Sequence, residues 1–293
     1  MVAPVKSPGG MRRRKNERAR DLCVSGTGNT YRCASALRDC LSVLGRETSL
    51  HRVENGGSVT EKELVLCYPV HGFNAPQIMV RFCKKLQNGT GNIWFLKTSG
   101  EPLRLNDSSS SQMTRILKKK GYSVKGEFHY VMPYNMIFRH SDEMAALMWR
   151  TAQDRIPDAV QQIATGRGHP AKPGPGARTM AGLCRIEHGF FPVNGRLFSV
   201  DRKRCTGCMK CVSDCPVGNF RCEDGKFPFG GNCTGCMRCS FDCHAGAIHI
   251  GILDVMRVNG LYDFETDPEG AELGRYCRKA YKRYFRAGNR SDT

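Results

Sequence analysis

Apolar residues in the first half of the chain follow two alternating patterns, which predict strands and helices in turn. Three continuous apolar runs, Leu64–Tyr68, Ile93–Leu96 and Phe128–Met132, have the length of buried strands. Around them, apolar residues recur every three or four positions, as they do along one face of a helix. The helices predicted in this way cover residues 33–44, 75–86 and 143–163, and a fourth, capped within 107–110, runs to 120. Strands that alternate with helices are typical of a parallel α/β sheet.

Polar turns follow the strands at their carboxyl ends, where parallel sheets bind ligands. Residues 25–30 read Ser-Gly-Thr-Gly-Asn-Thr and directly precede the first predicted helix. Hydroxyl groups, glycines and free backbone N–H groups at a helix N-terminus form a cradle for an anion. This turn lacks the lysine and the spacing of a nucleotide P-loop, and none of its side chains is charged. It therefore suits a phosphate monoester held by neutral donors, such as the phosphate of FMN.

Cysteines mark the second half of the chain in a pattern that occurs twice. The first run is Cys205-x2-Cys208-x2-Cys211-x3-Cys215, and the second is Cys233-x2-Cys236-x2-Cys239-x3-Cys243. The two runs agree at eight of eleven positions with an offset of 28, so they form an internal repeat. Two short apolar segments, Leu197–Val200 and Ile248–Ile250, predict a pair of strands that flanks the repeat.

This spacing is typical of iron–sulfur ligation. Structural zinc usually binds two separated pairs of cysteines, and nothing in the sequence indicates the secreted protein in which disulfides would be expected. In two-cluster bacterial ferredoxins, the fourth cysteine of each run binds the other [4Fe–4S] cluster. Cluster I would thus take Cys205, Cys208, Cys211 and Cys243, and cluster II would take Cys233, Cys236, Cys239 and Cys215.

Composition and charge narrow the choice of partners and compartment. The chain has 293 residues, a net charge of +18 and no stretch near the roughly 20 apolar residues of a transmembrane helix. Residues 1–20 and 273–293 each hold seven Lys or Arg against one acidic residue. The two ends together therefore carry two thirds of the net positive charge. Charge concentrated in the ends favours an acidic redox partner over nucleic acid. Free cysteines and the lack of a signal peptide predict a reducing cytoplasm, and the clusters suit an anaerobic host.

The motifs together resemble a known family. Residues 25–30 resemble the phosphate loop of flavodoxins, and the joining of such a domain to a two-cluster ferredoxin resembles the fusions called EFR-family ferredoxins. Further matches are Pro69-Val70-His71-Gly72-Phe73 and Met132-Pro133-Tyr134-Asn135, so the resemblance runs from about Asp21 to Phe264. It implies an α/β flavodoxin-like doubly wound parallel sheet of strand order 2-1-3-4-5. A small α+β two-cluster ferredoxin domain would follow.

The resemblance also implies where FMN would bind. By position, the phosphate would be held by Ser25, Thr27, Gly28, Asn29 and Thr30. The isoalloxazine ring would be flanked by Pro69, Val70, His71 and Gly72, and by Thr98, Ser99 and Gly100. Phe73 or Tyr134 could stack on the ring, although an aromatic residue at either position is equally typical of a core.

The predicted boundaries place two domains between basic ends. They are a basic extension (1–20), the FMN domain (21–164), a Gly- and Pro-rich linker (165–180), the ferredoxin domain (181–264) and a basic tail (265–293). The tail contains a predicted helix over 272–287 with Tyr276, Ala280 and Tyr284 on one face, which would pack on the ferredoxin domain or dock on a partner.

Two features depart from the flavodoxin pattern. Residues 18–24 include the charged Arg18, Arg20 and Asp21, whereas a central parallel strand is usually apolar throughout. No helix is evident between His51 and Leu64.

The sequence predicts an electron carrier that passes electrons between FMN and two [4Fe–4S] clusters and on to a redox partner protein, with no catalytic residue assigned. Two alternatives stay open. One is an FMN-dependent reductase of a small acceptor, for which His71 and Tyr134 are the candidate proton donors. The other is a ferredoxin with a vestigial flavodoxin domain, which the weak first strand would explain.

Overall fold

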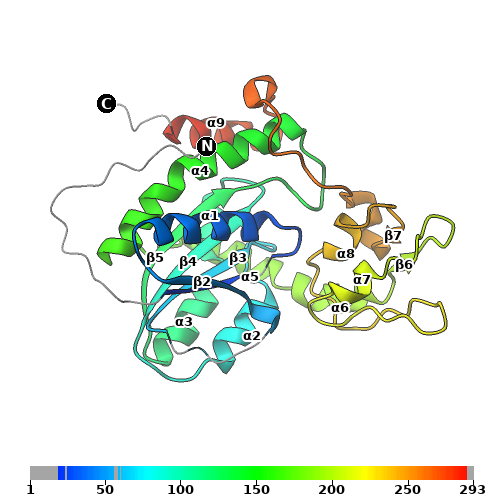
Figure 1. The fold of residues 1–293 in the computed structure, drawn as a ribbon, viewed down its shortest axis with the longest axis horizontal. Helices are drawn as coiled ribbons and strands as arrows, with labels where there is room; N and C mark the ends of the chain where they lie inside the picture. Colours follow the sequence, from blue (N-terminus) through cyan, green and yellow to red (C-terminus); the bar gives the residue numbers. More distant parts are fainter. Residues whose placement is uncertain (1–18, 24, 56–58, 60, 289–293) are drawn as a thin grey trace.

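Five parallel strands form the sheet of the first domain, in the order β2-β1-β3-β4-β5 (Figure 1). The computed structural model describes residues 19–23, 25–55, 59 and 61–288. The strands are β1 (Ala19–Cys23), β2 (Thr48–Arg52), β3 (Glu63–Pro69), β4 (Asn92–Ser99) and β5 (Ser123–Val131). Every neighbouring pair is parallel, so the flavodoxin-like strand order is confirmed.

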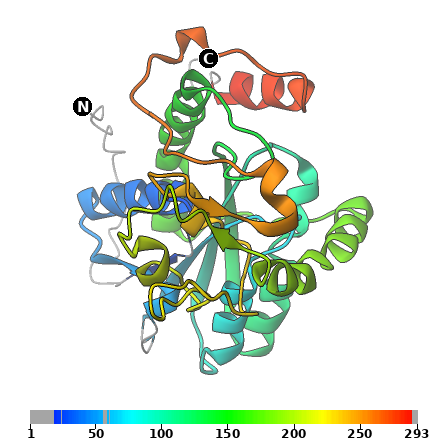
Figure 2. The ribbon, with the colours of Figure 1, turned by 90° about the vertical axis from the view of Figure 1, so that its right-hand side faces the viewer.

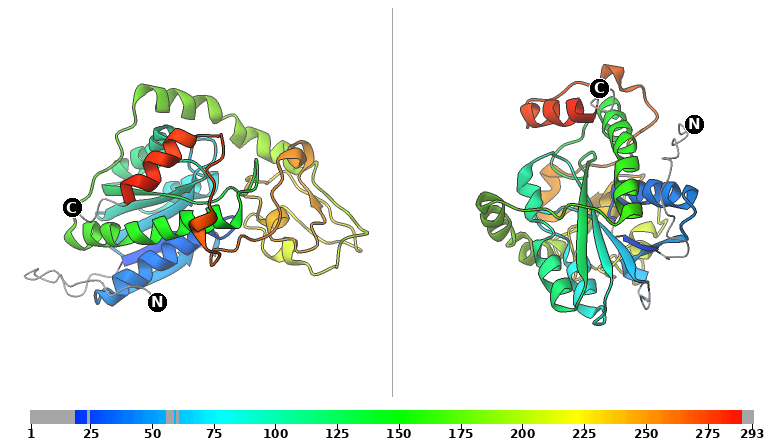
Figure 3. Two further views of the ribbon diagram at one scale, coloured as in Figure 1. Left: turned by 90° about the horizontal axis from the view of Figure 1, so that it is seen from above. Right: turned by 90° about the vertical axis from the view of Figure 1, so that its left-hand side faces the viewer.

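Helices cover both faces of this sheet (Figures 1 and 3). α1 (Asn29–Val43) and α4 (Asp142–Thr165) cover one face, and α2 (Gln77–Lys85) and α3 (Ser111–Lys119) cover the other. Side chains of β3 alternate between the two cores: Val65 and Cys67 pack with α1 and α4, whereas Leu64 and Leu66 pack with α2 and α3. Ser141 caps α4, because its hydroxyl accepts a hydrogen bond from the Met144 amide at 3.2 Å.

The first part of the sheet differs from the sequence-based expectation in two ways. β1 has five residues and pairs along its whole length with both β2 and β3, so the short segment before Ser25 does form the central strand. β2 was missed, because its residues are polar and mostly half-buried, as befits an edge strand. Between β2 and β3, the described residues contain only a short 3₁₀ helix, η1 (Val53–Asn55).

Another difference lies between β4 and α3. The predicted capping segment 107–110 is partly taken up by a 3₁₀ helix, η2 (Arg104–Ser108), and α3 begins at Ser111 without a side-chain cap.

The cysteine runs lie in a small second domain beside the carboxyl ends of the strands (Figure 1). Its elements are α6 (Glu187–Gly195), β6 (Ser199–Val200), α7 (Lys210–Ser213), α8 (Arg238–Phe241), β7 (Ile248–His249) and η3 (Gly251–Met256). β6 and β7 pair antiparallel, which confirms the predicted pair of strands. Its core holds Phe191, Phe198, Phe220, Met237, Ile248 and Ile250.

The predicted linker is only partly extended. α4 ends at Thr165, and α5 (Pro175–Cys184) begins inside the predicted segment 165–180. Proline is compatible with the first turn of a helix, so the Pro content did not exclude a helix here. α5 packs against η2 of the first domain.

The C-terminal segment returns to the first domain (Figure 2). After η4 (Pro268–Gly270), α9 (Arg278–Gly288) begins six residues later than predicted, and Tyr276 lies before it. Tyr281 of α9 joins a core with Val131, Met144 and Met148 of the flavodoxin-like domain. The expectation that this helix packs on the ferredoxin domain is therefore wrong, because the apolar surface beside β5 and α4 takes it up.

Residues 1–18 of the basic extension lie outside the described residues. Within the part of the chain that is described, no helix combines the length and the apolar character needed to cross a membrane.

Candidate cofactor sites

The eight cysteines of the repeat gather in two groups of four, each drawn from both runs. In the first group, Cys208, Cys243 and Cys205 interact electrostatically with Cys211. In the second, Cys236, Cys233 and Cys215 interact with Cys239. One cavity is lined by Cys205, Cys208, Cys211, Cys239 and Cys243, and a second is lined by Cys215, Cys233, Cys236 and Cys239. The fourth cysteine of each run thus lies with the first three of the other, as cross-ligation of two clusters requires.

The chemistry of these groups fits iron–sulfur clusters. Burial and then the neighbouring thiolates raise the pKa of Cys211 and of Cys233 to about 11. A raised pKa means that these cysteines stay protonated unless a cation stabilises their thiolates. Four thiolates can therefore converge here only around a positively charged group. Among the described residues, no three His, Cys, Asp or Glu side chains have the spacing that a single metal ion requires. A cube of four irons is wider than one ion.

The backbone repeats around the two groups. Met209 and Met237 adopt left-handed conformations with φ of 57° and 58°, and each precedes a one-turn helix. The Cys215 sulfur accepts a hydrogen bond from the Asn219 amide at 3.2 Å. The Cys243 sulfur accepts one from the Ala247 amide at 3.4 Å. Hydrogen bonds to sulfur are one of the means by which a protein sets cluster potentials.

The surroundings of the two groups differ. Cys208 of the first group is exposed, whereas the second group is covered by α6 and by residues 25–30. A Cβ atom on Gly195 of α6 would lie 2.3 Å from the Cys233 Cβ, so α6 packs directly on the loop that carries Cys233. The second group is therefore the one that faces the flavodoxin-like domain.

Residues 25–30, which we call the phosphate loop after the flavodoxin motif that they resemble, join β1 to α1. Gly28 has a φ of 95°, a left-handed conformation that favours glycine, and its amide donates to the Ser25 hydroxyl at 3.1 Å. The hydroxyls of Thr30 and Thr98 lie 2.7 Å apart. The Asn29 side-chain amide donates to the Pro133 carbonyl at 2.8 Å. These bonds tie the loop to the ends of β4 and β5.

A cavity of about 1080 Å³, including its open mouth, lies at the carboxyl ends of the strands. It brings together eleven of the twelve residues predicted to bind FMN: Ser25, Thr27, Asn29, Thr30, Pro69, Val70, His71, Gly72, Thr98, Ser99 and Gly100. The twelfth, Gly28, lines an adjoining crevice. Neutral hydroxyls and amides surround the end formed by the phosphate loop. The residues present therefore fit FMN.

Both predicted aromatic residues line this cavity. Phe73 has a φ of 60°, an unfavourable conformation for a bulky residue, and such strain is often found at binding sites. The Tyr134 ring packs against Gly100, where a Cβ would lie 2.3 Å from the ring, and stacks on His140 at 5.4 Å between centroids. Its hydroxyl donates to the Glu101 carboxylate.

Other lining residues were missed by the sequence analysis: Glu101, Glu187, Phe191, Gly235 and Tyr276. Three of them come from the second domain, and Tyr276 comes from the C-terminal segment. No periodicity or motif marks Glu187, which reaches the cavity because α6 packs on the turn after β3. A Cβ on Gly72 would lie 2.4 Å from its carboxylate.

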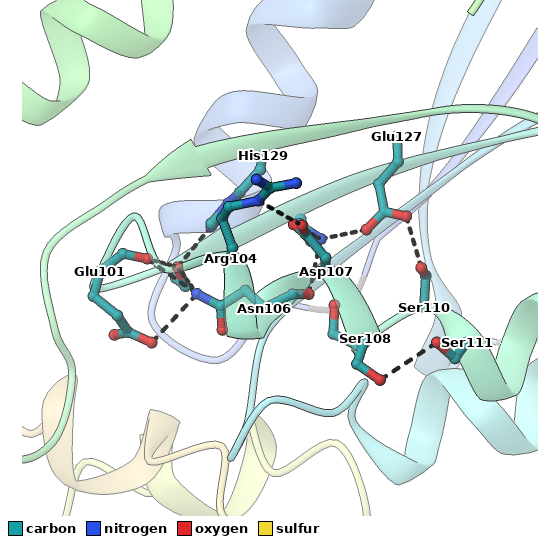
Figure 4. A network of polar contacts seen from close by, with 12 residues as sticks. Glu101, Arg104, Asn106, Asp107, Ser108, Ser110, Ser111, Glu127 and His129 are labelled. Carbon is teal, nitrogen blue, oxygen red and sulfur yellow. Dashed lines mark hydrogen bonds and ion pairs between the residues drawn. The ribbon is translucent and has the colours of Figure 1, made fainter. Parts of the chain in front are cut away.

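A buried polar network supports the wall formed by Ser99 to Glu101 (Figure 4). The Asn106 side-chain amide donates to the Ser99 hydroxyl at 3.1 Å and to the Glu101 carbonyl at 3.0 Å. The Ser99 hydroxyl donates to the Glu101 carbonyl at 2.6 Å and lies 2.7 Å from His129 Nε2. Lys97 Nζ donates to the Asn106 carbonyl at 2.8 Å. The network therefore fixes the loop that follows β4.

Burial shifts the titration of several groups around the cavity. Burial and the neighbouring His188 lower the pKa of His71 to about 4. Burial also raises the pKa of Glu101 and of Glu187 above the usual range. His71 is therefore neutral near pH 7.

The cavity and the second cysteine group adjoin directly. Gly235, between Cys233 and Cys236, lines the cavity. A Cβ on Gly26 of the phosphate loop would lie 2.2 Å from the Cys236 carbonyl oxygen, so the two loops touch through their backbones. A cofactor in the cavity would thus lie beside the second group rather than the first.

Comparison with known proteins gives one family match. Residues 197–220, which include the first cysteine run, match the family of 4Fe-4S binding domains, so the chain contains such a domain. No curated protein shows significant sequence similarity to the chain.

Solved structures similar to this chain include flavodoxins. A flavodoxin from Streptococcus pneumonia TIGR4 aligns at 14% identity and a TM-score of 0.38, over 50% of this chain and 98% of its own. The Megasphaera elsdenii flavodoxin aligns at 17% identity and a TM-score of 0.33, over 39% of this chain and 85% of its own. Rubredoxin oxygen:oxidoreductase from Desulfovibrio gigas aligns at 9% identity and a TM-score of 0.37, over 53% of this chain and 38% of its own. The flavodoxin-like assignment therefore relies on strand order and connectivity.

Proposed function

We propose that this chain is an electron-transfer protein of the EFR-ferredoxin type, with FMN in the cavity and two [4Fe–4S] clusters in the cysteine groups. The observation that carries the proposal is the direct contact between the phosphate loop and the second cysteine group. FMN exchanges two electrons and each cluster exchanges one, so such a protein would interconvert two-electron and one-electron transfers.

The residues would hold these groups as follows. The phosphate loop and Thr98 would bind the FMN phosphate, and the turns 69–72 and 98–100 would flank the ring. Cys205, Cys208, Cys211 and Cys243 would bind cluster I, and Cys233, Cys236, Cys239 and Cys215 would bind cluster II. The exposed Cys208 makes cluster I the natural site for exchange with a partner protein. Its surroundings include the exposed Arg202, Lys203, Arg204 and Lys210, which suit an acidic partner.

The content of anaerobically purified protein tests this proposal. We expect about one FMN, eight iron and eight sulfide per chain, from two four-iron clusters and one flavin. Four iron per chain would exclude the second cluster, and eight iron with no binding of added FMN would mean that the chain acts as a ferredoxin alone.

A second candidate, reduction of a small acceptor, is favoured by one contact. The Tyr134 hydroxyl and the Glu101 carboxylate form a hydrogen-bonded pair in the cavity wall, from which a proton could be supplied. Turnover of an acceptor that falls in Tyr134→Phe, while FMN content stays unchanged, would support the reductase. Equal turnover in both proteins would leave the electron carrier as the function.

A further inference from the structure

The guanidinium group of Arg238 connects the cluster II loop to the phosphate loop. Its Nε donates to the Gly26 carbonyl at 3.1 Å, and its Nη2 donates to the Ser25 carbonyl. Nη2 also donates to Glu54 Oε1 at 2.8 Å, and Nη1 donates to the Asp214 carbonyl at 2.8 Å. One side chain, only 9% exposed, thus joins the phosphate loop, the residues after β2 and the first cysteine run.

These bonds determine which side of the phosphate loop presents donors. A trans peptide directs its N–H opposite to its C=O. Because the carbonyls of Ser25 and Gly26 point to Arg238, the amides of Gly26 and Thr27 point away from it. Both residues line the cavity. Arg238 therefore holds the loop with amide donors, rather than carbonyl oxygens, available to an anion.

The same positive charge lies beside the ligands of cluster II. Arg238 is flanked in the sequence by Cys236 and Cys239, and it interacts electrostatically with Cys236. A nearby cation favours the more negative, reduced form of a cluster, whereas a phosphate dianion in the loop opposes it. Arg238 is thus placed between two groups whose charges act on one another.

The internal repeat supplies a natural comparison, because Lys210 occupies the position of Arg238 in the first run. Each residue opens a short helix after a left-handed methionine. Both residues line the cavity of the first cysteine group, but Lys210 is exposed, whereas Arg238 is buried against the flavodoxin-like domain. Lysine also offers one point charge rather than the fork of donors that these four bonds use.

We propose that Arg238 is a positioning residue that couples binding of the flavin phosphate to the reduction of cluster II. This inference rests on the proposed function, since it requires both cofactors. Coupling is reciprocal: if bound FMN makes cluster II harder to reduce, reduction of cluster II must weaken FMN binding by the same factor.

The test compares wild type, Arg238→Met, Arg238→Lys and Lys210→Met. FMN and riboflavin affinities are measured by fluorescence quenching, and both cluster potentials are measured by EPR-monitored titration with and without FMN. We expect Arg238→Met to weaken FMN binding at least tenfold, to leave riboflavin binding unchanged and to abolish the FMN-dependent shift of one cluster. A tenfold coupling corresponds to about 59 mV for a one-electron couple.

The two remaining variants are the controls. Lys210→Met should keep both the FMN affinity and the shift. Arg238→Lys keeps the charge but not the four bonds, so it should weaken FMN binding while the potential of cluster II stays nearer the wild-type value; it also carries the test if Arg238→Met does not retain its iron.

Two results separate this inference from the proposed function. Unchanged FMN affinity and an unchanged shift in both Arg238 variants would overturn the inference alone. A wild-type protein that binds no FMN, or only one cluster, would overturn the proposed function and the inference with it.

Discussion

At the scale of single residues, a buried charge supports the wall of the cavity formed by Ser99 to Glu101. Lys97 is 1% exposed, and its ammonium group is bonded to Glu127 and lies 4.0 Å from Asp107. Glu127 also accepts a hydrogen bond from the Ser110 hydroxyl at 2.6 Å. A buried pair adds little stability compared with apolar residues, but the loss of one partner leaves an uncompensated charge.

Lys97→Met should therefore lower the free energy of unfolding by roughly 3–5 kcal/mol. The double variant with Glu127→Leu should recover part of this loss, because no lone charge stays buried. Chemical denaturation followed by circular dichroism measures both, with the exposed Lys118→Met as the control. Equal losses in the single and double variants would show that the pair does not act as described.

His129 makes stability depend on acidity. Burial, with Lys97 and Arg155 nearby, lowers the pKa of His129 from 6.5 to about 3. Between these values the unfolded chain binds a proton that the folded protein does not, so stability falls as the pH falls, by up to about 1.4 kcal/mol per unit. His71 and His140, each with a pKa lowered to about 4, act in the same direction.

Thermal melts of His129→Gln from pH 7.5 to 5 test this. The variant should lose less stability than the wild type over that range, while the remaining histidines preserve part of the slope. Identical slopes in the two proteins would contradict the assignment of a neutral, buried His129.

At the scale of elements, α9 completes the edge of the sheet beyond β5. The Tyr284 hydroxyl accepts a hydrogen bond from the Val131 amide at 3.1 Å, and the Tyr281 hydroxyl donates to the Gly100 carbonyl. The Arg155 guanidinium lies 3.8 Å from the centroid of the Tyr284 ring. Through Gly100, the helix also acts on the wall of the cavity.

Tyr284→Phe should cost about 1–3 kcal/mol, the penalty for a buried amide without a partner. Hydrogen exchange should show faster exchange of the Val131 amide, and the conservative surface change Tyr31→Phe serves as the control. Unchanged exchange at Val131 would mean that α9 does not protect this edge.

Elements were predictable where burial leaves a clear pattern. β3 and β4 are buried on both faces, and α4 carries a hydroxyl cap, so each appears in the sequence as an apolar run or a capped periodic segment. β2 and α9 escaped or shifted because their positions depend on tertiary partners: β2 is a polar edge strand, and α9 packs on residues distant in the chain.

The candidate sites divide in the same way. The cysteines and the phosphate loop were predictable because their chemistry fixes residue type and spacing. Glu187, Tyr276 and the contacts of Arg238 arise from the packing of the domains on each other, which leaves no local signal.

At the scale of the whole molecule, the two domains meet where the cofactors would be nearest. Gly26→Ala should separate the phosphate loop from the cluster II loop, because its Cβ would lie 2.2 Å from a backbone oxygen. We expect weaker FMN binding and an altered EPR signal of one cluster. Gly182→Ala, whose Cβ would meet nothing within 4 Å, is the matched control; equal behaviour of the two variants would argue against the close contact.

The central claim is that electrons pass within one molecule between the cavity and the cysteine groups. The most direct test is a stopped-flow experiment on protein loaded with FMN, in which the clusters are reduced by a rapid one-electron donor and flavin absorbance is followed. The account predicts flavin reduction at a rate independent of protein concentration. A rate proportional to protein concentration, or clusters that stay reduced beside oxidised flavin, would contradict it.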